Sequence, residues 1–243
     1  MPFQTGQISE QGGRHSNQDF CGFIQIAETA CWVLADGLGG HAGGATASRM
    51  AVEAMLEIFR QNPAGSCSTE WLKESLQNVH TSIGKQSEEV YELEGMRTTI
   101  VVLVSDGKNA LWAHAGDSRL YHFRNGKIVV QTKDHSIPQL MVDTGKITVD
   151  EIRGHEDQNR LLKSLGQQGD LRPAILGSKQ EIVAGDVFLL CSDGLWGYIL
   201  ENEMESFLKG TANPQHWLEE MRNQLLKRAT GSYDNYTAIA VFV

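Results

Sequence analysis

Four aspartates stand where an apolar run of the sequence begins or ends, and this placement makes them candidate metal ligands. Asp36, Asp117 and Asp193 each follow such a run, whereas Asp234 precedes the run that closes the chain. Strand ends are places where a fold can gather carboxylates that are distant in the sequence. If the four ends lie on one side of a sheet, their oxygens form a pocket suited to Mg²⁺ or Mn²⁺ and, through the ions, to a phosphate.

An Asp-Gly pair is first of all a turn signal, so each aspartate needs support beyond its own position. Asp106, which precedes a glycine between two strand-like runs, is explained by a hairpin turn alone. Asp36 begins a glycine-dense loop between a strand and a helix, where backbone atoms can approach an ion or a phosphate closely. For Asp36 the metal-site and ordinary-loop interpretations both remain open on spacing alone. For each of the other three aspartates, taken singly, a turn or a cap is the more common explanation.

Arg14 lies in a polar, glycine-containing segment over residues 12–19. A lone arginine on such a loop is usually a surface charge. In a pocket of carboxylates, however, its guanidinium can hold phosphate oxygens in a bidentate fork while metal ions neutralise the remaining charge. The same segment ends at Asp19, an additional carboxylate beside the strand that is expected to begin at Phe20.

Size and composition favour one globular domain over residues 1–243, because no stretch reads as a linker. The net charge of −9 and the absence of any basic run longer than a pair argue against a nucleic-acid-binding surface. No apolar stretch reaches the roughly 18 residues that span a bilayer, and the N-terminus lacks the pattern of a signal peptide. We therefore expect a cytoplasmic protein without a membrane segment, and its four cysteines are expected to be buried, reduced thiols.

The hydrophobic pattern predicts a layered sandwich. A strand-like run over 98–104 shows no alternation of apolar and polar residues, so both its faces are expected to be covered, one by a second sheet and one by helices. A four-stranded antiparallel meander is expected over 98–132, and a polar, irregular, helical stretch over 136–166 has the character of a flap. The other expected strands are 20–26, 31–35, 171–182, 186–192 and 236–243, and the expected helices are 45–61, one from 68 or 69 to 83, and 214–228.

Taken in order, eight motifs resemble those of the metal-dependent protein phosphatases of type 2C, in their short bacterial form. The motifs occupy residues 14–19, 35–41, 95–99, 116–121, 134–136, 161–166, 191–195 and 234–237. Each is weak alone, but their order and approximate spacing make coincidence very improbable. The resemblance runs nearly end to end. It implies an α+β, four-layer α-β-β-α sandwich of two antiparallel sheets flanked by helices, with a cleft at one end.

The resemblance also implies a centre of two Mn²⁺ or Mg²⁺ ions and assigns its ligands. By position, Asp36 bridges both ions, the Gly37 carbonyl binds one of them, and Asp193 with Asp234 holds the other. Asp117 with Asp193 matches an additional, weaker third metal site of bacterial members. Arg14 matches the phosphate-binding arginine of the family. Asp19 is expected at the metal site, behind the residues that bind the ions directly.

Two positions depart from the pattern of many eukaryotic relatives. Leu38 stands where those relatives have a histidine thought to protonate the leaving group, and His41, three residues later, is the nearest substitute for a general acid. Gln18 stands where many relatives have an acidic residue, so water is expected to complete that metal shell, as in bacterial members.

The resemblance therefore implies a serine/threonine protein phosphatase, in which a water between two ions attacks the phosphorus of phosphoserine or phosphothreonine. Its expected partners are phosphorylated proteins, and a serine/threonine kinase would oppose it; neither nucleic acid nor membrane is expected to bind, and a monomer is expected. Two alternatives remain open: a catalytically silent phosphoprotein-binding member of the same fold, and a hydrolase of small phosphoesters.

Overall fold

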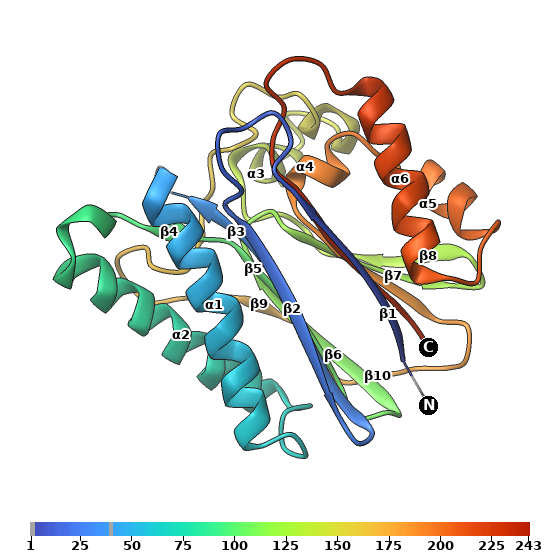
Figure 1. Cartoon of the computed structure of the whole chain (residues 1–243), viewed down its shortest axis with the longest axis horizontal. Coiled ribbons are helices and arrows are strands. Elements are labelled where there is room, and N and C mark those ends of the chain that lie inside the picture. The colour runs from blue at the N-terminus through green and yellow to red at the C-terminus, as the bar shows by residue number, and fades with distance from the viewer. Residues whose placement is uncertain (1–2, 39–40) are drawn as a thin grey trace.

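Two antiparallel β-sheets pack face to face and carry helices on their outer faces, as the computed structural model in Figure 1 shows. The structure describes residues 3–38 and 41–243, without the side chains of His41 and Ala42. Its strands are β1 (Gln4–Glu10), β2 (Asp19–Ile26), β3 (Thr29–Leu38), β4 (Arg97–Thr98), β5 (Ile100–Ser105), β6 (Asn109–Ala115), β7 (Arg119–Arg124), β8 (Lys127–Gln131), β9 (Ala174–Ile175), β10 (Gln180–Glu181), β11 (Val187–Cys191) and β12 (Tyr236–Phe242).

The helices lie in two groups on opposite sides of the sandwich. They are α1 (His41–Gln61), α2 (Thr69–Glu89), α3 (Ile137–Asp143), α4 (Asp193–Trp196), α5 (Glu201–Leu208) and α6 (Pro214–Arg228), with short 3₁₀ turns at Tyr91–Leu93 and Val149–Ile152. In Figure 1, α1 and α2 cover one sheet, and α5 and α6 cover the other. Among the described residues, no helix combines the length and the apolar character needed to cross a bilayer.

The order of the strands brings the two ends of the chain together. One sheet has the order β1-β12-β11-β7-β8, and the other has the order β10-β6-β5-β3-β2, with β4 added beside β3 and β9 beside β6. Because β1 pairs with β12 along its whole length, the loop that follows β1 lies next to the loop that precedes β12. This pairing determines where Arg14 and Asp234 meet.

Three apolar layers hold the sandwich together. Trp32 and Leu103 lie in the layer between the two sheets. Met55 of α1 and Leu76 of α2 pack on the outer face of one sheet, and Trp217 of α6 packs on the outer face of the other. These side chains are almost completely buried, so the four-layer sandwich expected from the sequence is confirmed.

The predicted meander over 98–132 is wrong at its centre. β5 pairs with β6 and β7 pairs with β8, but β6 and β7 belong to different sheets. The chain crosses from one sheet to the other at Gly116, whose φ of +108° is rarely adopted by L-residues and whose missing Cβ would lie 2.6 Å from the Thr99 side chain. Turn signals do not reveal which sheet receives the next strand, so this crossing was not predictable from them.

Other elements differ from the pattern in smaller ways. β1 was not predicted, the strand expected over 171–182 is reduced to the two-residue strands β9 and β10, and α1 begins at His41 rather than at residue 45. The cysteines are all free thiols, and three of them are buried.

A close backbone approach makes Gly194 a test of the packing between α4 and β12. A Cβ at this position would lie 1.8 Å from the Asn235 carbonyl oxygen. Gly194→Ala is therefore expected to lower the free energy of unfolding by about 1–3 kcal/mol, measured by urea denaturation of the metal-free protein. Gly84→Ala in α2 is the control, because nothing lies within 4 Å of its added methyl group and the change favours a helix by up to about 1 kcal/mol. An unchanged stability of Gly194→Ala would contradict the described contact.

Candidate active site

The candidate catalytic aspartates meet at one end of the sandwich. Figure 1 shows the loop after β1, the segment before β12 and the flap region gathered at this end. They surround a cavity of about 410 Å³. Its walls are formed by Gly13, Arg14, His15, Ser16, Gln18, Asp36, Gly37, Leu38, Asp117, Asn159, Leu161, Asp193, Ser232, Asp234 and Asn235.

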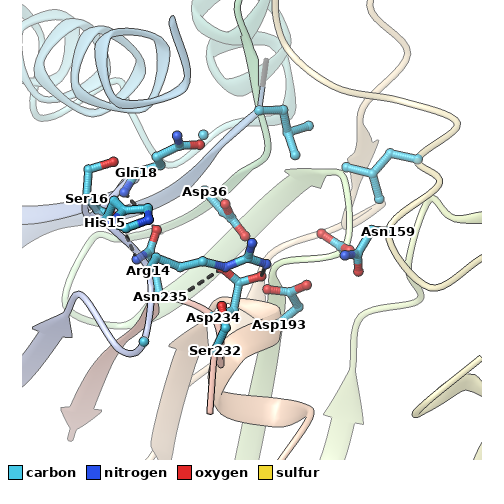
Figure 2. A pocket seen from close by; sticks show the side chains of 15 residues that line it. Arg14, His15, Ser16, Gln18, Asp36, Asn159, Asp193, Ser232, Asp234 and Asn235 are labelled. Atoms are coloured by element: carbon cyan, nitrogen blue, oxygen red, sulfur yellow. Dashed lines mark hydrogen bonds and ion pairs between the residues drawn. The ribbon is translucent and has the colours of Figure 1, made fainter. Parts of the chain in front are cut away.

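Arg14 points into the group formed by three of the carboxylates, as Figure 2 shows. Its Nε donates to Asp234 Oδ1 at 3.0 Å and its Nη2 donates to Asp234 Oδ2 at 2.8 Å. The carboxylates of Asp36 and Asp193 lie nearby and raise the pKa of the guanidinium further, after the hydrogen bonds and charge of Asp234 itself. Three negatively charged side chains therefore surround the Arg14 guanidinium, which is the cation that occupies this part of the cavity.

Asp36 is fixed at the end of β3 by two threonines of the neighbouring strand segment. Its backbone N–H donates to Thr99 Oγ1 at 3.0 Å, and its carbonyl oxygen accepts from Thr98 Oγ1 and from the Thr99 N–H, both at 2.8 Å. Since its backbone is held on both sides, its side chain has a defined direction into the cavity.

The side chain of Asn235 organises the loop that carries Arg14. Its Oδ1 accepts from the Gln18 N–H at 2.9 Å, and its Nδ2 donates to the carbonyl oxygens of Gln11 at 2.7 Å and Ser16 at 2.9 Å. Asn235 was part of a recognised motif, but its role as the organiser of this loop was not predicted, because its partners lie at the other end of the chain.

Asp19 lies behind the cavity and does not line it. It stands directly opposite Asp36 in the register of β2 and β3, and its Oδ2 accepts a hydrogen bond from Ser192 Oγ at 2.7 Å. Its other oxygen, Oδ1, is buried without a hydrogen-bond partner. A buried carboxylate oxygen left in this way is suited to a water or ion beside Asp36.

Asp117 enters the cavity from the crossing between the two sheets. Ser118, the next residue, shares a hydrogen bond of 2.7 Å with the same Thr99 hydroxyl that holds the backbone of Asp36. The backbones of Asp36 and Asp117 are thus linked through two hydroxyl groups. Asp193 reaches the cavity from the first residue of α4 rather than from a plain turn.

Burial and mutual repulsion make these acids hard to ionise without cations. Burial raises the pKa of Asp19 to about 6 and that of Asp193 to about 7, with repulsion from Asp234 acting on both. Burial also raises the pKa of Asp36, where Asp19 and Asp193 add repulsion, and that of Asp117, where Asp193 does so. Metal ions would reverse this penalty, because a nearby cation favours the ionised carboxylate.

These shifts predict how stability depends on pH. An acid whose pKa is raised in the folded state stabilises the fold below its unfolded pKa near 4, and this contribution is lost as the pH rises through the folded pKa of about 6 for Asp19 and about 7 for Asp193. Partly buried His135 acts in the opposite sense, because desolvation, and then His114 and Lys163, lower its pKa to about 3. Its contribution is present above pH 6.5 and is lost as the pH falls toward 3.

We therefore expect the gain in Tm that Mn²⁺ produces to increase from pH 5 to pH 8. At the lower pH the ion must displace protons from the carboxyls, whereas the contribution of His135 is common to both states and cancels in the difference. Thermal unfolding monitored by circular dichroism, with chelator and with Mn²⁺ at each pH, measures this gain. A Mn²⁺-induced gain that is constant or falls over this range would contradict the expectation.

The oxygen atoms that line the cavity are of the kind that binds Mg²⁺ or Mn²⁺, although the described carboxylates do not lie close enough together to coordinate one ion. Among the described residues, no three side chains of His, Cys, Asp or Glu meet as ligands of one ion. Both oxygens of Asp234 are engaged by Arg14 instead. The remaining donors, which are carboxylate oxygens, the unpartnered Asp19 Oδ1 and the backbone of Gly37, are the oxygen ligands that Mg²⁺ and Mn²⁺ prefer.

The stretch expected to act as a flap, residues 136–166, contributes to the wall of the cavity, although the sequence did not single out Asn159. Asn159 and Leu161 form part of its wall, and Figure 2 shows Asn159 on the side of the aspartates that faces away from His15 and Ser16. Leu38 lines the cavity as well, whereas the side chain of His41, the candidate general acid, lies outside the described residues.

Comparison with known proteins places this geometry in a family. The family model described as protein phosphatase 2C matches residues 7–231. The chain is 32% identical over 234 residues to the serine/threonine phosphatase stp of Listeria monocytogenes, covering 94% of this chain and 90% of that protein.

Solved structures agree with this match over the whole chain. The serine/threonine phosphatase Stp1 of Staphylococcus aureus superposes with a TM-score of 0.91 at 27% identity, covering 100% of this chain and 96% of that one. The catalytic domain of the serine/threonine protein phosphatase PstP, solved in complex with 2 manganese ions, superposes with a TM-score of 0.84 at 28% identity, covering 99% and 97%.

Proposed function

This chain belongs to the protein phosphatase 2C family and is a serine/threonine protein phosphatase, for which we propose a centre of two Mn²⁺ or Mg²⁺ ions held by Asp36, Gly37, Asp193 and Asp234. The observation that carries the proposal is the convergence of Asp36, Asp193 and Asp234 around the Arg14 guanidinium in one cavity. Carboxylates that repel one another in this way need cations, and the two manganese ions in PstP are the precedent.

Each residue of the site has a distinct task in this proposal. Asp36 would hold both ions, the Gly37 carbonyl would hold one of them, and Asp193 with Asp234 would hold the other. Asp117 would complete a third, weaker metal site together with Asp193. Asp19 lies behind the direct ligands and accepts a hydrogen bond from Ser192. When bound, the two ions lower the pKa of the attacking water and neutralise charge on the phosphoryl oxygens.

Arg14 binds the phosphate of the substrate. Its guanidinium points into the cavity and donates to both carboxylate oxygens of Asp234, which is also a proposed metal ligand. With Asp234 holding an ion instead, the guanidinium of Arg14 would be free to donate two parallel N–H groups to phosphoryl oxygens. The proton of the leaving serine or threonine is then supplied by water or by His41, since Leu38 has no proton to give.

The wider setting follows the same proposal. The substrates are proteins phosphorylated on serine or threonine, a serine/threonine kinase opposes the enzyme, and the chain acts as a cytoplasmic monomer. Residues 1–243 form one catalytic domain in which residues 136–166 act as a flap over the cleft. The wall formed by Asn159 and Leu161 supports this role of the flap.

A substrate comparison tests the proposal. Hydrolysis of a phosphothreonine peptide, p-nitrophenyl phosphate and a nucleotide is measured with Mn²⁺ and with chelator. We expect Mn²⁺-dependent turnover with the highest kcat/KM on the phosphopeptide. Binding of the phosphopeptide without turnover would indicate a silent binding protein, and faster turnover of the nucleotide would indicate a small-molecule phosphoesterase; either result would overturn the proposal.

A further inference from the structure

The indole of Trp196 connects two of the proposed metal ligands. Trp196 is the last residue of α4, the short helix that begins at Asp193. It is completely buried, and its Nε1–H donates to the backbone carbonyl oxygen of Asp117 at 2.9 Å. Asp193 and Asp117, which come from different elements, are therefore joined through one side chain and one helical turn.

Two arginines hold Trp196, one at its indole ring and one at its backbone. The Arg119 guanidinium carbon lies 3.5 Å from the centroid of the Trp196 ring, within the range of a cation–π contact. Arg153, from the flap region, donates its Nε–H to the Trp196 carbonyl oxygen at 2.9 Å and pairs with Glu201 at 2.6 Å. The Trp196 side chain and backbone are thus each fixed by a separate arginine.

Arg119 is in turn fixed by a buried carboxylate. Its Nε and Nη2 donate to the two oxygens of Asp134 at 2.8 and 2.7 Å, and the two side chains are only 2% and 1% exposed. A buried ion pair of this kind is a poor source of stability, because removing both charges from water offsets most of their attraction. Its clearest consequence here is geometric, since it sets the plane on which the indole rests.

We propose that Trp196, held by Arg119, is a positioning residue that sets the distance between Asp117 and Asp193 and so determines the affinity of the third metal site. The inference rests on the proposed metal centre. The indole N–H holds the backbone of Asp117 while α4 holds Asp193, so losing this hydrogen bond lets the Asp117 carboxylate move away from its partner. The two tighter ions depend on Asp36, Asp193 and Asp234, whose backbones do not use this bond.

The test compares two tryptophans that make the same kind of bond in different places. Trp196→Phe removes the bond to Asp117 and keeps an aromatic ring. Trp217→Phe is the matched control, because Trp217 is equally buried and its Nε1–H donates at 3.0 Å to the Met204 carbonyl oxygen in the core under α6. Mn²⁺ is titrated into each metal-free variant by calorimetry, and Asp117→Asn identifies the binding step that depends on Asp117.

For Trp196→Phe we expect the Asp117-dependent step to weaken by roughly 10–100-fold, the usual effect of removing a partner that orients a metal ligand, while the two tighter steps change by less than about 2-fold. Trp217→Phe is expected to lose thermal stability without any change in the Mn²⁺ steps. Arg119→Lys, which loses the planar contact with the indole and the fork on Asp134, is expected to shift the same step in the same direction.

The inference is overturned if Trp196→Phe leaves the Asp117-dependent step unchanged, if Trp217→Phe shifts that step equally, or if Asp117→Asn removes no Mn²⁺ step. These failures differ from a failure of the proposed function. In each of them the wild-type protein still binds two tight Mn²⁺ ions and Asp36→Asn binds at most one. A wild-type protein without tight Mn²⁺ binding would instead overturn the metal centre and this inference together.

Discussion

Asp36→Asn is expected to lower Mn²⁺-dependent kcat/KM on a phosphopeptide by at least about 10³-fold, because the neutral amide cannot hold two cations close together. The fold is expected to survive. The metal-free variant should have a higher Tm than the wild type, since one of several buried, mutually repelling carboxyls is removed. Activity is measured at several Mn²⁺ concentrations, and Tm is measured by circular dichroism.

Asp106→Asn is the matched control for this substitution. Asp106 also precedes a glycine, but its carboxylate accepts hydrogen bonds from the backbone N–H groups of Lys108 and Asn109 in a hairpin far from the cavity. The control is expected to keep wild-type kcat/KM. Full Mn²⁺-dependent activity of Asp36→Asn would show that Asp36 is not a ligand of the catalytic ions.

Arg14→Ala is expected to have opposite effects on turnover and on metal binding. Phosphopeptide kcat/KM should fall by about 10²–10³-fold, because the fork that stabilises the phosphoryl oxygens is lost. Mn²⁺ should bind up to about 5-fold more tightly, because the ion no longer competes with a guanidinium for Asp234 and a half-exposed pair of this kind is worth up to about 1 kcal/mol. Steady-state kinetics and Mn²⁺ calorimetry measure the two effects.

Two further variants separate the charge of Arg14 from its shape. Arg14→Lys keeps a cation near Asp234 but loses the bidentate fork, so it should lose activity without gaining Mn²⁺ affinity. Arg60→Ala, at the far end of α1, should change neither quantity, because Arg60 pairs with the surface residue Glu57, one helical turn away. Weaker Mn²⁺ binding by Arg14→Ala would contradict the competition for Asp234.

The proposed ligand residues were predictable because each occupies a position that the local sequence marks. Asp36 and Asp193 end apolar strands, and Asp234 precedes one, so their placement at one end of a sandwich follows from local pattern and motif order. The local pattern predicted a turn at Asp193, whereas the structure shows that Asp193 is the first residue of the short helix α4.

The connections between the proposed ligands were not predictable, because they depend on contacts between distant parts of the chain. Arg14 meets Asp234 across 220 positions only because β1 pairs with β12, and β1 itself carries too weak an apolar pattern to be recognised. In the same way, Asp117 reaches the cavity through a crossing between sheets that resembles a hairpin in the sequence. Nothing in the local sequence marks Trp196 as the donor to the carbonyl oxygen of Asp117, because that contact joins residues 79 positions apart.

The most direct test of the metal centre is the number of Mn²⁺ ions that bind tightly to each chain, measured by calorimetric titration of the metal-free protein. The wild type is expected to bind two ions tightly, and Asp36→Asn is expected to bind at most one. Two tight Mn²⁺ ions on Asp36→Asn, with the affinities of the wild type, would contradict the assignment of Asp36 as the bridging ligand and with it the proposed centre.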